Sequence, residues 1–83
     1  MNGEGMKKLG ISETVDDIIL DIMPDAALLT DDEVFERLDS LELFDLIFNI
    51  EERFGITVED SELDTLTDKS KLVDLIYSRV ATT

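Results

Sequence analysis

The chain has 83 residues, of which 21 are acidic and 7 are basic, so its formal net charge is −14, and it contains no histidine and no cysteine. A single domain of this size buries only about 60–65% of the surface that the unfolded chain exposes, which leaves room for one core but not for a deep catalytic cleft. The charge excludes nucleic acid and anionic membrane surfaces as partners, and it favours proteins that carry basic patches.

The N-terminal half of the chain predicts a tail, a helix and a long connection. The first ten residues hold three of the four glycines and show no hydrophobic period, so residues 1–11 predict a flexible tail. An amphipathic helix is predicted over residues 12–23, with Ser12 as its N-cap and Pro24 directly after its end. Residues 24–38 are rich in aspartate and predict a long connection.

The C-terminal half predicts a strong helix over residues 39–54 that ends at Gly55, where a left-handed C-cap favours glycine. Residues 60–66 predict one or two helical turns. Thr67 or Asp68 is expected to cap the last helix, whose apolar face is formed by Leu72, Leu75, Ile76 and Val80. The pattern predicts an all-α four-helix bundle, three main helices plus one short helix, with a long loop after the first. Its single domain covers residues 12–80, with a C-terminal tail over 81–83.

Several kinds of chemistry are excluded by the composition. Without histidine and cysteine, Ser-His-Asp and Cys-His catalysis and the usual zinc ligand sets are not possible. The stretch "DSELDTLTDKSK" has acids where a calcium loop needs them, but Thr65 replaces the required glycine and Lys71 the required glutamate. No spacing brings two carboxylates together in a cleft. We therefore expect neither an enzyme nor a metal site, and the missing apolar spans predict a cytoplasmic protein.

The helix after Asp39 divides into three faces on a helical wheel. The expected core stripe contains Leu43, Ile47, Ile50 and Phe54. The opposite stripe contains Glu42, Asp45, Asn49 and Glu52. Between them lies a second apolar strip formed by Leu41, Phe44 and Phe48, called the apolar strip below. The sequence allows two interpretations of this strip: it packs beneath residues 24–38, or it forms an exposed docking surface. Both remain open for Phe44, whereas docking is favoured for Leu41 and Phe48.

Ser40 stands at the start of this helix and has two interpretations. The free N–H groups and partial positive charge of a helix N-terminus would stabilise a phosphate attached to a serine there. The alternative is that Ser40 serves only as a helix N-cap.

The stretch "LDSLELFDLIFNIEERFGI" resembles the signature helix of acyl carrier proteins, in which an Asp-Ser-Leu triplet opens the second helix. The resemblance covers about residues 12–80. It implies that a phosphopantetheinyl transferase attaches 4′-phosphopantetheine from coenzyme A to Ser40, flanked by Asp39 and Leu41. A fatty acyl, polyketide or aminoacyl group would then be carried as a thioester, as in fatty acid or polyketide biosynthesis.

The resemblance also implies a set of partner-binding residues, comprising the apolar strip Leu41, Phe44 and Phe48 and the acidic residues Glu42, Asp45, Glu51 and Glu52. They would contact basic patches on acyl-loading, condensing or transferring enzymes, and the carrier itself would be a monomer. The alternative is an acidic helical adaptor or inhibitor that binds a basic protein, with Ser40 as a cap.

Overall fold

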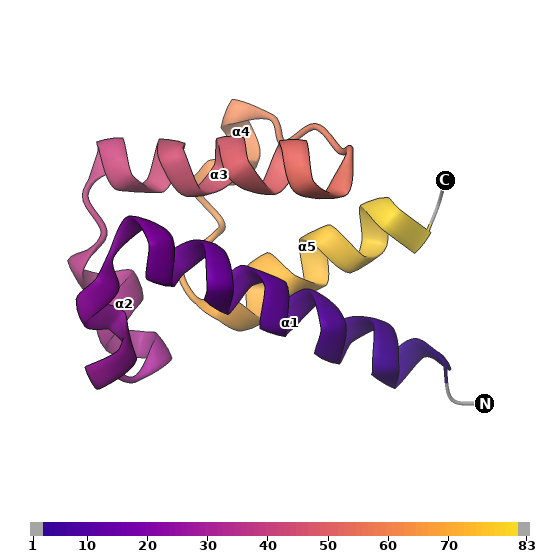
Figure 1. Cartoon of the computed structure of the whole chain (residues 1–83). Coiled ribbons are helices and arrows are strands. Elements are labelled where there is room, and N and C mark those ends of the chain that lie inside the picture. The colour runs from indigo at the N-terminus through magenta and orange to yellow at the C-terminus, as the bar shows by residue number, and fades with distance from the viewer. Residues whose placement is uncertain (1–2, 82–83) are drawn as a thin grey trace.

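The computed structural model describes the backbone of residues 3–81 and the side chains of residues 8–80, and this part is all-α, without strands. Its elements are the helices α1 (Gly3–Ile22), α2 (Asp31–Arg37), α3 (Ser40–Phe54), α4 (Asp60–Leu63) and α5 (Lys69–Ala81), with a 3-10 turn, η1 (Pro24–Leu28), between the first two. The predicted all-helical bundle, with its short helix before the last one, is confirmed (Figure 1).

The core lies where α1 contacts both α3 and α5. In Figure 1, α3 runs along the top of the view, and α1 and α5 lie below it. The largest fully buried side chains are Leu46, Ile50, Leu72, Ile76 and Val15, which come from these three helices. Such close packing of apolar side chains from three amphipathic faces supplies the main stabilising term for a domain of this size.

The first helix begins earlier than the sequence predicted. It starts at Gly3, so Ser12 lies inside the helix, and the prediction that Ser12 caps it is wrong. Ile11, which lies in the expected tail, is buried in the core. The Lys8 ammonium pairs with Asp74 at 3.1 Å and lies 5.2 Å from the centre of the Tyr77 ring, so the early turns of α1 gain contacts to α5 that a local sequence pattern cannot show.

The segment after Pro24 is also more ordered than predicted. Instead of a long loop it contains η1 and the seven-residue helix α2. Thr30 caps α2 through a capping box: its hydroxyl accepts the Glu33 N–H at 3.2 Å, and the Glu33 carboxylate accepts the Thr30 N–H at 2.9 Å. This Thr-x-x-Glu spacing was the sequence signal for the missed helix.

The remaining helix ends follow the expected chemistry. Gly55 adopts the left-handed conformation, with φ of 67°, at the end of α3. Of the two candidate caps for α5, it is Asp68 whose carboxylate accepts the Lys71 N–H, at 2.9 Å. In the expected apolar face of α5, Leu72 and Ile76 are buried, while Leu75 and Val80 are half-buried.

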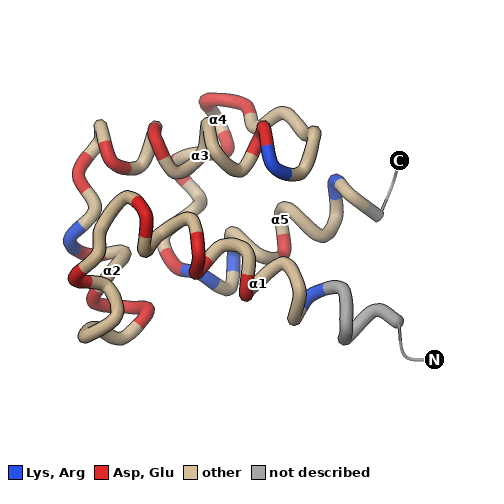
Figure 2. The backbone as a smooth tube through the Cα atoms, viewed as in Figure 1, with Lys and Arg blue, Asp and Glu red and all other residues tan. Residues whose placement is uncertain are grey.

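Acidic residues occur on all five helices, whereas the few basic residues are scattered (Figure 2). Lys69 of α5 offsets part of this imbalance, because its ammonium lies 2.7 Å from the Asp16 carboxylate of α1 and 3.8 Å from the Asp31 carboxylate of α2. Within the described residues, none of the helices combines the length and the apolar character that a membrane span requires.

Candidate functional site

The site is organised around the start of α3, where Asp39 and not Ser40 occupies the N-cap position. Asp39 has an extended conformation, with φ of −87° and ψ of 179°, and its carboxylate accepts the Glu42 N–H at 2.8 Å. The Glu42 carboxylate in turn accepts the Asp39 N–H at 3.1 Å, which closes a capping box. The interpretation of Ser40 as a simple helix cap is therefore wrong, because the preceding carboxylate already fills that position.

Ser40 is the first residue of α3, and its side chain is exposed to solvent. Among the described residues, its hydroxyl takes part in no hydrogen bond with another side chain or with the backbone. The first bond of the helix runs from the Leu43 N–H to the Asp39 carbonyl at 2.9 Å, so the N–H groups of Ser40 and Leu41 precede the hydrogen-bonded ladder. An accessible hydroxyl beside two such donors at the positive end of a 15-residue helix suits a covalently attached phosphate group.

The apolar strip is exposed along the same helix. Leu41, Phe44 and Phe48 retain 79%, 54% and 56% of their accessible surface, so the strip does not pack beneath residues 24–38. Asp45 and Glu52 lie exposed on the same helix. Three large apolar side chains bordered by acids form a surface suited to binding another protein.

Two of the acids predicted to bind partners have additional bonds within the protein. Glu42 is half-buried and closes the capping box of α3. Glu51 is half-buried as well, and its carboxylate accepts the Val58 N–H at 2.8 Å, which ties α3 to the segment that follows it. This geometry gives Glu51 a structural role and leaves it outside the exposed surface formed by the strip, Asp45 and Glu52.

A hollow of about 360 Å³ lies beside Ser40. It is lined by residues of α3 and of the α4 region, namely Ser40, Leu43, Phe44, Asp60, Leu63 and Asp64. Sequence reasoning did not find this feature, because it depends on how α4 packs against α3. The only local signal was Leu63, an apolar residue within an acidic turn.

The described residues contain no group of acidic side chains placed to hold a metal ion. The described chain is thus a small helical domain that presents an exposed serine, with no capping role, beside an exposed apolar strip.

Comparison with known proteins identifies the family. The chain is 35% identical over 79 residues to the acyl carrier protein of Petrotoga mobilis, an alignment that covers 90% of this chain and 93% of that protein. It is 35% identical over 71 residues to the acyl carrier protein of Campylobacter hominis, covering 80% and 89% respectively. No family model matches the chain, and no solved structure matches it significantly. At this identity and coverage, the chain belongs to the acyl carrier protein family.

Family membership confirms the resemblance found in the sequence and makes the chain a carrier protein that is not an enzyme. Acyl carrier proteins generally bear a phosphopantetheine group and interact with biosynthetic enzymes, commonly those of fatty acid synthesis. The observations at the start of α3 bear on where this chain would hold that group.

Proposed function

We propose that Ser40 is the attachment site of 4′-phosphopantetheine and that the chain carries an acyl group on it between enzymes in the cytoplasm. The observation that carries the proposal is the exposed Ser40 hydroxyl, which serves no capping role at the N-terminus of α3. When attached, the arm supplies a flexible tether with a terminal thiol that holds the acyl group.

The attachment needs an external enzyme. The chain has no histidine or cysteine, and the adjacent Asp39 carboxylate is already bound to the Glu42 N–H. A phosphopantetheinyl transferase would therefore take the proton from the Ser40 hydroxyl. The hydroxyl oxygen would then bond to the phosphorus of coenzyme A that bears the pantetheine, while the nucleotide part departs. The N–H groups of Ser40 and Leu41 would stabilise the resulting negative phosphodiester.

We assign partner binding to the apolar strip together with Asp45, Glu52 and the outer part of Glu42. Acids around exposed apolar side chains steer a basic enzyme surface toward Ser40, while the strip supplies the contact area once the two proteins meet. A carrier must release each enzyme after use, and weak, electrostatically steered encounters of a monomeric carrier meet that requirement. The transferase and the enzymes that load, condense or transfer the acyl group would use this surface in turn.

The hollow beside Ser40 favours an apolar cargo. Leu43, Phe44 and Leu63 line it with apolar side chains, and Asp60 and Asp64 line it as well. An acyl chain can bury methylene groups there, at a gain of about 0.8 kcal/mol for each group fully buried. A negatively charged cargo would be repelled by the two aspartates. A fatty acyl or similar apolar group is therefore favoured over a charged one.

The test is enzymatic modification followed by mass measurement. The purified chain is incubated with coenzyme A and a broad-specificity phosphopantetheinyl transferase, and its intact mass is recorded. We expect one phosphopantetheine adduct, absent in Ser40→Ala and present in Ser61→Ala, a matched variant at an exposed serine of α4. A folded but unmodified wild-type chain would overturn the proposal and favour the acidic adaptor.

A further inference from the structure

Arg79 of α5 contacts two residues that are distant from it in the sequence, Thr57 and Glu62. One guanidinium nitrogen donates to the Thr57 carbonyl at 2.5 Å, in the link between α3 and α4. The other pairs with the Glu62 carboxylate of α4. The side chains of Arg79 and Glu62 are only 33% and 25% exposed, so solvent screens this contact less than it screens an ion pair on the open surface.

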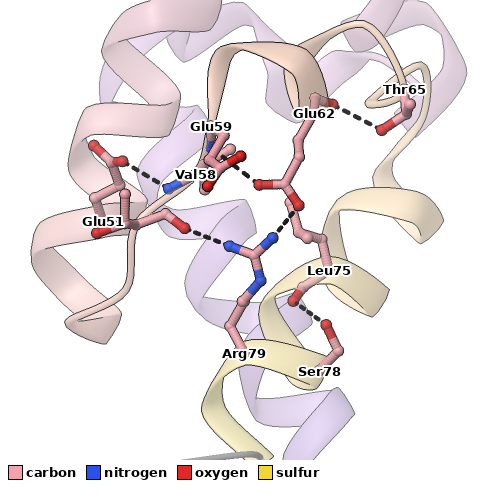
Figure 3. Close-up of polar contacts among 9 residues, drawn as sticks. Glu51, Val58, Glu59, Glu62, Thr65, Leu75, Ser78 and Arg79 are labelled. Carbon is pink, nitrogen blue, oxygen red and sulfur yellow. Dashed lines mark hydrogen bonds and ion pairs between the residues drawn. The ribbon is translucent and has the colours of Figure 1, made fainter.

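Glu62 makes a second contact with its other carboxylate oxygen. That oxygen accepts the Glu59 N–H at 2.9 Å, at the N-terminus of α4. The same carboxylate thus holds the first turn of α4 and fastens that turn to α5. Because both contacts converge on one side chain, α4 and α5 are coupled through Glu62 (Figure 3).

Helix α4 is the shortest helix of the described chain and buries little apolar surface. None of its four residues is fully buried, and Leu63 alone packs half-buried against the core. A helix of one turn is not stable by itself in water. The preceding segment is held to α3 by the Glu51 carboxylate, which accepts the Val58 N–H at 2.8 Å.

The position of α4 matters because this helix forms one wall of the hollow beside Ser40. Asp60, Leu63 and Asp64 line it from the α4 side, and Leu43 and Phe44 line it from α3. Any movement of α4 away from α3 would widen the hollow, and any closer approach would narrow it.

We propose that Arg79 is a positioning residue that latches α4 against the bundle and thereby sets the width of the hollow beside Ser40. With the guanidinium bound to Thr57 and Glu62, α4 is held in place. When those contacts break, α4 loses this attachment to α5, and the hollow opens to admit or release a bulkier group. The consequence for cargo rests on the proposed function, but the latch itself does not.

The latch is tested first on the unmodified chain by amide hydrogen exchange. The relevant N–H groups are those of Glu62, Thr65 and Leu66, which donate to the carbonyls of Glu59, Glu62 and Leu63. In Arg79→Gln we expect these amides to exchange about tenfold faster, while the Met23 amide at the end of α1 keeps its rate. Arg53→Gln is the matched control. This substitution removes the same charge, but Arg53 is exposed and has no ion pair among the described residues.

Two results would overturn the latch. One is unchanged exchange of the Glu62, Thr65 and Leu66 amides in Arg79→Gln. The other is an equal acceleration at Met23, which would show that the substitution loosens the whole bundle and not α4 in particular.

The effect on the hollow is tested on the modified protein. An apolar fluorophore whose emission depends on polarity is attached through the Ser40 arm, and emission maxima are compared. We expect a shifted maximum in Arg79→Gln and none in Arg53→Gln. If the amides of Arg79→Gln exchange faster but the emission maximum is unchanged, then Arg79 does not set the width of the hollow. If Ser40 takes no arm at all, the proposed function fails, whereas the exchange result for the latch still stands.

Discussion

Asp39 and Glu42 cap each other at the start of α3: each side-chain carboxylate accepts the backbone N–H of the other residue, at 2.8 and 3.1 Å. Ser40 lies between them in the sequence and takes no part in this pair. The arrangement fixes the first helical turn and keeps the serine hydroxyl available. Asp39 thus stabilises the start of the helix, while the adjacent Ser40 is left for the proposed attachment.

The capping role of Asp39 predicts a measurable loss of stability. We expect Asp39→Ala to lower the free energy of unfolding by about 1 kcal/mol, because the Glu42 N–H loses its acceptor. Asp39→Asn keeps a side-chain oxygen and should restore most of the loss. Urea denaturation measures both. Asp45→Ala removes an exposed acid from the same helix and should change stability by less than about 0.5 kcal/mol; an equal loss in that variant would refute the capping assignment.

The helix around Ser40 could be predicted from the sequence because its apolar residues recur with a strong helical period and Gly55 marks its end. The start was placed correctly to within a residue, but the cap was not assigned to Asp39. The wheel also left Leu46 out of the core stripe, although this residue is fully buried. Contact with α1 widens the buried arc of α3, and a wheel of one helix cannot show how wide its neighbour makes that arc.

Features that depend on two elements at once were beyond the sequence. Whether Phe44 was covered or exposed depended on the path of residues 24–38, which form η1 and α2 and leave the strip uncovered. The structural role of Glu51 depended on where the Val58 N–H would lie. The ion pair between Glu62 and Arg79 joins residues 17 positions apart. In each case tertiary placement decided the outcome, and no local pattern reports it.

The docking surface predicts a specific effect of charge reversal. Asp45→Lys with Glu52→Lys changes the net charge from −14 to −10, since each substitution adds two charges. We expect kcat/KM of a phosphopantetheinyl transferase to fall about tenfold at low ionic strength, and less at high salt, because association loses its steering. The variant leaves Glu42 unchanged, because substituting Glu42 would also break the capping box of α3.

The control for this prediction carries the same charge on another helix. Glu13→Lys with Asp17→Lys places it on exposed positions of α1. If docking uses the surface of α3, the control should retain most of the activity of the wild-type chain. Equal losses in the two double variants would mean that only net charge matters, and the assignment of a docking surface would fail.

The α2 capping box predicts a pH effect confined to that helix. The hydrogen bond from the Thr30 N–H lowers the pKa of the Glu33 carboxyl below its ordinary value of 4.5; desolvation opposes this, while the Thr30 hydroxyl and Arg37 reinforce it. Because the folded pKa lies below the unfolded one, the stabilisation is fully present above pH 4.5 and disappears as pH falls through the folded pKa. The Glu33 carboxyl ¹³C shift and the exchange of the Val34 amide, followed against pH, should report this loss together. An identical pH dependence of that amide in Glu33→Gln would contradict it.

Leu46 and Phe44 lie two positions apart on α3, with 0% and 54% of their surface exposed, and they predict opposite outcomes when truncated. Leu46→Ala should lower the free energy of unfolding by about 2–5 kcal/mol, because it leaves a cavity in the core. Such a loss is a large part of the total stability of about 5–15 kcal/mol expected for a small domain. Leu46→Met, which nearly conserves volume, should cost less than about 1.5 kcal/mol and keeps the measurement possible if the alanine variant does not fold.

Phe44→Ala should change stability by less than about 1 kcal/mol, since the ring is more than half exposed, but it should reduce kcat/KM of the transferase by removing contact area at the docking surface. Guanidinium denaturation and transferase kinetics on the same set of variants separate the two effects. A large loss of stability in Phe44→Ala with unchanged kinetics would place the ring in the core and remove it from the docking surface. The opposite pattern would show that one helix buries Leu46 for folding and exposes Phe44 for partners.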